Sequence, residues 1–212
     1  MKLYTYFRSS AAYRVRIALN LKGVTHEAVP IDLRPAAHRQ PDYLARNPQG
    51  LIPALEDGGA VIAQSLAIIE YLDETHPLPP LLPRTPLDRA RVRSLALAIA
   101  CDIHPLNNLR VLNYLRSPLG HDQATVDAWY RHWIDEGFRA LEEEAKRHSG
   151  DGRHMFGGEV TLADVCLVPQ MFNARRLECD VEPFPTLRAI CAHLEPLPAF
   201  ARAAPGAQPD AS

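Results

Sequence analysis

The chain has 212 residues, of which 47% are hydrophobic and 23% charged, and this composition is typical of a globular protein rather than a disordered one. A formal net charge of −2 gives no reason to expect nucleic acid or an anionic membrane surface as a partner. The sequence has no apolar run of membrane-spanning length, and it begins with a polar, strand-like segment rather than a secretory signal, so we expect a cytoplasmic protein without a membrane span.

Short patterns near the N-terminus predict a first strand and a first helix. Residues 2–6 favour a strand, and an apolar repeat over residues 15–19 favours a helix that Gly23 would end. A strand that leads into a helix through a serine turn places backbone N–H groups and the positive helix end beside the serines. Such a place suits an anion, and a thiolate is an anion.

The turn between that strand and that helix carries Arg8, Ser9 and Ser10. Either serine can serve simply as the cap of the helix, since serine is among the preferred residues at that position. The segment alone leaves two interpretations open, a structural cap or an anion site.

The rest of the first eighty residues continues the alternation of strand and helix signals. Residues 25–31 predict a second strand, which the strand–helix–strand order makes parallel to the first. Asp57-Gly58-Gly59 signals a hairpin, and Ser65 is expected to cap the next helix. The other elements expected here are a short helix around 42–46 and strands over 52–56 and 61–63. This βαβ unit followed by ββα is typical of a thioredoxin-like domain.

Five prolines crowd residues 77–86, where none of them could occupy a helix interior, and they predict an interdomain linker. Beyond it, the periodicity favours helices over 88–115, 123–147, 162–177 and 186–193, followed by a loose tail over 203–212. The sequence therefore predicts an α/β, thioredoxin-like domain over 1–81 and an all-α domain over 88–212.

The predicted all-α domain contains polar residues at helical spacing. His104, Asn108 and, less closely, Arg110 could share one helix face, although Pro105 should bend or break that helix. Arg176 adds a cation to a helix otherwise rich in apolar residues, and the planar fork of arginine suits carboxylates. The alternative is that these residues form only a solvated surface.

Two other features of this half favour structure over chemistry. The four cysteines show neither metal-ligand spacing nor a Cys-x-x-Cys motif, so we expect buried, reduced thiols and no metal site. Thr161 followed by Asp164 forms a capping-box pattern, which is a folding device.

Two further places in the first domain could receive a ligand. Pro53 opens a strand and is a candidate for a cis peptide bond, which would turn the backbone of Ile52 toward a ligand, with an ordinary trans bond as the alternative. Gln64 and Ser65 stand at a second strand-to-helix turn, where a helix N-terminus could receive a carboxylate. Together with the turn around Ser9, these places would suit a peptide-like ligand that has a thiol and carboxylates.

Several segments in combination resemble the zeta class of glutathione transferases. They are Phe7-Arg8-Ser9-Ser10, residues 14–19, Asn47-Pro48-Gln49, Ile52-Pro53, residues 64–72 and Thr161-Leu162-Ala163-Asp164. The resemblance implies a thioredoxin-like domain joined to a helical domain, a homodimer, and glutathione as the cofactor. It also implies cis–trans isomerisation of a small dicarboxylate, either maleylacetoacetate in tyrosine breakdown or maleylpyruvate in gentisate-type breakdown.

By this resemblance, each glutathione-contacting position receives a role. Ser9 or Ser10 would stabilise the thiolate. The main chain of Ile52, before a cis Pro53, would pair with the cysteinyl part. The remaining contacts are divided between the two ends of the peptide: Gln64 and Ser65 at the γ-glutamyl end, and Gln49 and His38 at the other end.

The resemblance also implies a substrate pocket with several cations. Its expected residues are Arg8, His104, Asn108, Arg110 and Arg176, with Asn108 also near glutathione. These arginines do not decide between the two substrates. The chain departs from the family at Ala11, where many members carry a cysteine, and this puts cysteine-dependent side activities in doubt but not isomerisation.

Two other functions remain as alternatives. A transferase that conjugates glutathione to electrophiles would have an apolar second pocket instead of the arginines. A non-catalytic relative should have lost the glutathione-contacting positions, and here they are retained.

Overall fold

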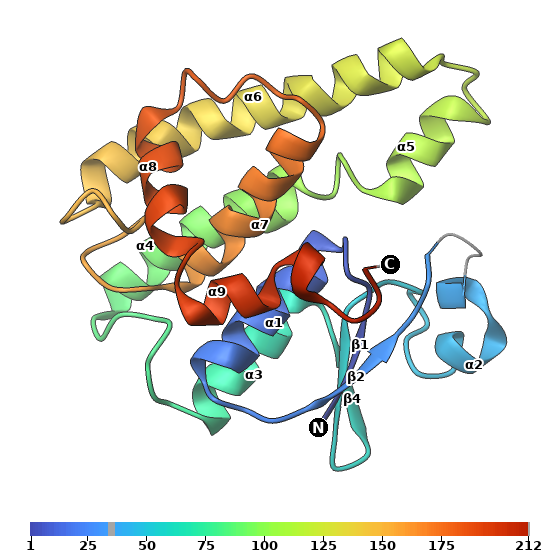
Figure 1. Ribbon diagram of the computed structural model, residues 1–212, viewed down its shortest axis with the longest axis horizontal. Coiled ribbons are helices and arrows are strands. Elements are labelled where there is room, and N and C mark those ends of the chain that lie inside the picture. Colours follow the sequence, from blue (N-terminus) through green and yellow to red (C-terminus); the bar gives the residue numbers. More distant parts are fainter. Residues whose placement is uncertain (34–36, 212) are drawn as a thin grey trace. The chain divides into compact units, whose positions relative to one another are not determined.

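The computed structural model describes residues 1–33 and 37–211. The chain divides into two compact units, one formed by Met1–Pro80 together with the residues from Pro196 onward and the other by Leu81–Glu195 (Figure 1). Each unit has its own secondary structure and core.

The first unit is built on a four-stranded mixed sheet with the order β2-β1-β3-β4. Its strands are β1 (Lys2–Thr5), β2 (Glu27–Pro30), β3 (Ala54–Asp57) and β4 (Ala60–Ala63). The parallel pairing of β1 with β2 and the antiparallel β3–β4 hairpin are confirmed. The hairpin turn needs glycine because Gly58 and Gly59 both adopt positive φ, +55° and +87°.

Helices cover the two faces of this sheet (Figure 1). The helices α1 (Ser10–Leu21) and α3 (Ser65–Thr75) pack against each other, and α2 (Pro41–Leu44) lies on the opposite side. On the α2 side, Tyr43 packs with Tyr4 and Ala54 in a small apolar cluster. The expected α1 is confirmed, with Val15 and Leu19 fully buried and the helix ending before Gly23.

The end of the chain is not the loose tail that the sequence predicts. A short helix, α9 (Pro198–Ala203), packs on α1 and buries Phe200, so the segment belongs to the first unit rather than to the helical one. The carbonyl of Ala203 accepts a hydrogen bond from Arg16. A six-residue helix has too few apolar positions for its periodicity to stand out in the sequence, and its docking depends on distant residues.

The second unit is helical. Its elements are α4 (Pro86–Leu97), a π-helical segment η2 (Ala98–Ile103), α5 (Leu109–Arg116), α6 (Gln123–His148), α7 (Leu162–Arg176) and α8 (Pro185–Leu194). The single helix expected over 88–115 is therefore divided, because Pro105 lies in a turn that separates η2 from α5. The expected break at this proline is confirmed.

Two acidic side chains hold helix N-termini in this unit. Asp164 accepts from the backbone N–H of Thr161 at 2.8 Å, which confirms the capping box. It also accepts from the backbone N–H of Met155 at 2.7 Å, so the carboxylate ties the preceding loop to the start of α7. Glu142 on α6 accepts from the N–H groups of Thr186 and Leu187, both at 3.0 Å, at the start of α8. Buried carboxylates thus satisfy donors that helices leave unpaired.

The four cysteines are free, as expected, but Cys101 is exposed on η2 while the other three are buried. The expectation of burial is wrong for Cys101 because a helix in a helical domain still presents one face to solvent. Within residues 1–33 and 37–211, no helix combines the length and apolarity needed to cross a membrane, and no group of His, Cys, Asp and Glu is arranged to hold a metal ion.

Candidate functional site

The strand register brings three predicted ligand-binding segments to one end of the sheet. Tyr4, near the end of β1, pairs with Ala54 at the start of β3, and Ala54 pairs with Ala63 at the end of β4. The turn after β1, the loop before β3 and the turn after β4 must therefore lie at the same end. These are the segments that carry Ser9, Pro53 and Ser65.

In the first of these segments, Ser9 is the N-cap of α1. Its Oγ accepts a hydrogen bond from the backbone N–H of Ala12 at 3.2 Å. A hydroxyl that accepts still has its own hydrogen to donate, so Ser9 can cap the helix and also donate to an anion. Ser10 is the first residue of the helix and is buried. The geometry favours Ser9 over Ser10 as the group that meets a ligand.

Beside Ser9, Arg8 is exposed but held in place by two aromatic residues. Its guanidinium lies 5.0 Å from the ring centroid of Phe7, and its Nη2 donates to the hydroxyl of Tyr6 at 3.2 Å. A cation fixed in this way stands next to the positive end of α1, which makes the turn attractive to negative charge.

The second segment contains a cis peptide bond between Ile52 and Pro53, so the cis alternative is the one adopted. The loop before it is fastened at the carbonyl of Leu51, which accepts from the hydroxyl of Tyr43 at 2.7 Å and from the amide of Asn47 at 2.8 Å. Ile52 itself is half-buried, and its main chain precedes β3 at the sheet end described above.

The third segment differs from the expectation by one residue. Gln64, not Ser65, occupies the N-cap position of α3, with φ of +73°, and its side chain makes no capping bond. Ser65 is buried in the first turn, where its Oγ accepts from Nη1 of Arg14 at 3.4 Å. A glutamine held at positive φ is uncommon, and such conformations concentrate at ligand-binding sites.

Gln49 joins this third segment across the fold. The Nε2 of Gln64 donates to Oε1 of Gln49 at 2.8 Å, and both residues are exposed. The next residue, Gly50, has φ of +57°, and a Cβ there would lie 2.9 Å from the carbonyl oxygen of His38. Only glycine fits this close approach.

His38 therefore lies behind the loop that carries Gln49. It is half-buried in a 3₁₀ turn, Ala37–Arg39, and burial lowers the pKa of its imidazole with help from the charge of Arg39. Among the described residues, its Nδ1 is buried without a hydrogen-bond partner.

The predicted residues of the second unit do not share a helix face. His104 follows η2, whereas Asn108 is the N-cap of α5 and accepts from the N–H of Arg110 at 3.1 Å. The turn around Pro105 separates them, so the expected helical spacing does not apply. The prediction of a common face is wrong, although the three residues remain close in sequence around one turn.

Arg176 is the last residue of α7 and is exposed. It lies beside Tyr130, where burial raises the pKa of the phenol to about 12 and the charge of Arg176 acts in the opposite direction. Arg110 and Arg176 therefore both stand at helix ends of the second unit, one near the start of α5 and the other at the end of α7.

Sequence reasoning missed Arg14 and Arg16, two buried arginines of α1. Arg14 donates to Ser65, and Arg16 donates to the backbone of the turn that carries Arg8. The sequence feature that could have revealed them is their position within an otherwise apolar helix. A charged side chain buried in such a helix needs polar partners.

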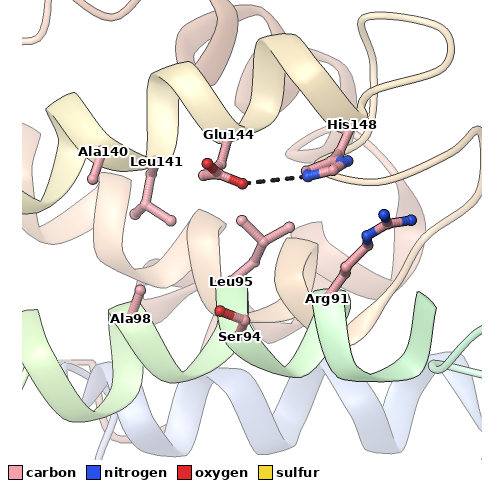
Figure 2. Close-up of a pocket in the computed structure, with 8 residues that line it drawn as sticks. All are labelled: Arg91, Ser94, Leu95, Ala98, Ala140, Leu141, Glu144 and His148. Atoms are coloured by element: carbon pink, nitrogen blue, oxygen red, sulfur yellow. Dashed lines mark ion pairs between the residues drawn. The ribbon is translucent and has the colours of Figure 1, made fainter. Parts of the chain in front are cut away.

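A shallow pocket of about 130 Å³ lies between α4 and α6 (Figure 2). The ion pair of His148 with Glu144, at 3.3 Å, stands at one end near Arg91, and Leu95 and Leu141 form an apolar part. None of its eight described lining residues is among the predicted site residues. It contains no part of the segments that carry Ser9, Pro53 and Ser65, so it is not the candidate site.

The chain is similar to known proteins over its whole length. Residues 1–74 match the profile of the glutathione S-transferase N-terminal domain. A Vibrio cholerae protein named a probable maleylacetoacetate isomerase is 51% identical over 211 residues, covering 99% of this chain and 97% of its own length.

Two solved structures are similar over the full length of the chain. The holo structure of maleyl pyruvate isomerase, described as a bacterial glutathione S-transferase of the zeta class, has a TM-score of 0.98 at 48% identity and covers 100% of both chains. The maleylacetoacetate isomerase of Methylobacterium extorquens AM1, with bound malonate and glutathione, has a TM-score of 0.96 at 43% identity, again covering 100% of both chains.

Proposed function

The chain belongs to the zeta class of the glutathione transferase family, and from that premise we propose that it is a glutathione-dependent cis–trans isomerase that converts maleylacetoacetate to fumarylacetoacetate in aromatic catabolism. The observation that carries the proposal is the strand register, which brings the segments carrying Ser9, Pro53 and Ser65 to the same end of the sheet.

The residues at that end fit the chemistry of a tripeptide thiol. The first turn of α3, at Ser65, offers backbone N–H groups to a carboxylate, as helix N-termini do. The Gln49–Gln64 pair presents amide donors and acceptors, and the backbone of Ile52 is suited to main-chain pairing with an extended peptide. When bound, glutathione supplies a thiolate that adds to the activated double bond and later leaves, so that rotation can occur in between.

The chain's own residues prepare this reaction electrostatically. The hydroxyl of Ser9 donates to the sulfur, and the positive end of α1 lowers the cost of the thiolate charge. Arg8 stands beside Ser9, and its guanidinium suits a substrate carboxylate and the negative charge that develops next to it during reaction. We assign the other carboxylate to the second unit, where Arg110, Arg176, His104 and Asn108 are the proposed contacts.

Residues 1–81 bind glutathione, with His38 near the end of the peptide that Gln49 contacts. The helical part of the predicted domain 88–212, which ends at Glu195, supplies the remaining substrate contacts. We further propose that the protein acts in the cytoplasm as a homodimer, which the family resemblance supports.

The second candidate is isomerisation of maleylpyruvate to fumarylpyruvate. It is favoured by the full-length similarity to maleyl pyruvate isomerase, with a TM-score of 0.98. Both substrates carry carboxylates at their ends, so the proposed arginines serve either one. A conjugating transferase is a weaker alternative, because exposed arginines at the proposed substrate positions do not suit an apolar electrophile.

An absorbance assay that offers each cis substrate separately, with and without glutathione, tests this proposal. We expect loss of maleylacetoacetate only when glutathione is present. Faster loss of maleylpyruvate would assign the second function, and no loss of either substrate would contradict the isomerase.

A further inference from the structure

The turn that carries Arg8 and Ser9, residues 6–9, is held from behind by a buried arginine of α1. Arg16 is 3% exposed, and its guanidinium donates to the carbonyl of Phe7 at 3.0 Å and to that of Tyr6 at 3.3 Å. The carbonyl of Tyr6 also accepts from the N–H of Ser9 at 3.0 Å. The position of the Ser9 backbone therefore depends on a carbonyl that Arg16 fixes.

The C-terminal segment, residues 203–211, completes this arrangement. The Nε of Arg16 donates to the carbonyl of Ala203 at 2.9 Å. The Oδ2 of Asp210 accepts from the backbone N–H of Phe7 at 2.9 Å. Both polar groups of the Phe7 backbone are thus bonded to residues outside the turn, and one of these residues lies 203 positions away in the sequence.

The guanidinium of Arg16 is buried near the carboxylate of Asp210. Burial lowers the pKa of Arg16 to about 10, and the nearby charge of Asp210 acts in the opposite direction. A buried guanidinium with four hydrogen-bonding partners is costly to move, so the backbone that it contacts is held firmly.

Phe7 links the hydrogen bonds of Arg16 and Asp210 to the side chain of Arg8. The ring of Phe7 lies under the guanidinium of Arg8 at 5.0 Å and packs edge-on against the ring of Tyr6, with centroids 4.8 Å apart. Tyr6 in turn accepts from Arg8 at 3.2 Å. A shift of the Phe7 backbone would therefore move the cation of Arg8 together with the hydroxyl of Ser9.

We propose that Asp210 is a positioning residue, which acts through the N–H of Phe7 to hold Arg8 and Ser9 in the geometry needed for catalysis. Asp210 then supports the position of the site residues Arg8 and Ser9, which are about two hundred positions before it in the sequence. This inference rests on the proposed function for its effect on turnover, but not for its effect on the turn.

Three variants separate positioning from general stability. Asp210→Ala removes the acceptor, whereas Asp210→Asn keeps an oxygen that can accept from Phe7 but removes the charge. Arg202→Ala, on an exposed position of α9, is the matched control in the same segment.

The first readout needs neither ligand nor turnover. Amide hydrogen exchange at Phe7 should be faster in Asp210→Ala than in the wild type, and near the wild-type rate in Asp210→Asn and in Arg202→Ala. Unchanged exchange at Phe7 in Asp210→Ala would overturn the proposal.

The second readout is the glutathione complex. Asp210→Ala should lower kcat by roughly tenfold to a hundredfold and raise the pKa of the bound thiol, followed by thiolate absorbance, with little change in the KM for glutathione. Asp210→Asn should restore most of both properties. Wild-type kcat in Asp210→Ala, or an equal loss in Arg202→Ala or Asp210→Asn, would overturn the inference.

If the wild type forms the thiolate but does not isomerise either substrate, the proposed function fails while the exchange and thiolate results still decide the role of Asp210.

Discussion

The amide nitrogen of Gln64 donates a hydrogen bond to the amide oxygen of Gln49 at 2.8 Å, across 15 residues of sequence. Gln64 holds this contact with φ of +73°, a conformation that ordinary residues rarely adopt. The pair joins the loop before the cis proline to the N-terminus of α3. It is therefore where we expect polar contacts with glutathione to be most sensitive to a single change.

Gln64→Gly should separate affinity from stability. Glycine adopts positive φ without strain, so the free energy of unfolding should stay constant or rise slightly. The lost side-chain contacts should weaken glutathione binding by roughly tenfold. Titration calorimetry and urea unfolding measure the two quantities, and a less stable variant with unchanged affinity would refute this reading of Gln64.

Ser9 and Ser10 should differ in their effects on the thiolate. Ser9→Ala removes the proposed sulfur donor and should lower kcat by roughly a hundredfold, as loss of one charge-stabilising donor does. It should also cost about 1 kcal/mol of stability through the lost cap. Ser10→Ala is the matched control and should retain thiolate formation. The assignment is reversed if the Ser10 variant loses the thiolate absorbance of bound glutathione and the Ser9 variant keeps it.

Arg176 and its neighbour Arg175 provide a test of the substrate contacts. Arg176→Ala should raise the KM for the dicarboxylate and leave the KM for glutathione unchanged, because only the substrate is assigned to this side chain. Arg175 is paired with Glu195, so Arg175→Ala is the control and should leave both constants near their wild-type values. Steady-state kinetics with each substrate varied in turn distinguish the two arginines, and equal effects would remove Arg176 from the proposed site.

Asp164 should matter for folding and not for chemistry. Asp164→Ala leaves the donors of Thr161 and Met155 without their acceptor and should lower the free energy of unfolding by about 1–3 kcal/mol. The folded variant should keep the wild-type kcat when assayed well below its melting temperature. Unchanged stability in urea unfolding would contradict the capping role.

The same carboxyl predicts a pH dependence. Burial raises the pKa of Asp164 to about 6, above its usual value. Between the usual value and about 6, the folded state binds more protons at this group than the unfolded state does, so its stabilising contribution is lost as pH rises through that interval. The stability difference between the wild type and Asp164→Asn should fall from about pH 4 to about pH 7. A difference that grows with pH would contradict the sign.

Local rules explain which parts of the fold could be predicted from the sequence. The glycine pair after Asp57, the Thr161–Asp164 box and the break at Pro105 each depend on a few adjacent residues, and all three were confirmed. The sequence predicts Ser65 as the N-cap of α3, but Gln64 occupies that position. This could not be anticipated, because glutamine has no preference for positive φ and adopts it here under tertiary constraint.

The parts of the candidate site that could not be predicted from the sequence are those held by contacts between distant residues. The short helix α9 has no strong pattern of its own, and the partners of Arg16 and Asp210 lie at opposite ends of the sequence. The Gln49–Gln64 bond likewise depends on how two loops meet at the sheet end. The roles of individual site residues came from family resemblance, since neither composition nor spacing distinguishes a capping serine from a thiolate donor.

The most direct test of the central claim is proton NMR of the product that the wild-type protein forms from maleylacetoacetate in the presence of glutathione. The account predicts the trans isomer, with its vinyl protons retained, glutathione returned unchanged, and no reaction when glutathione is omitted. A stable thioether adduct of glutathione, or equal turnover without glutathione, would contradict it.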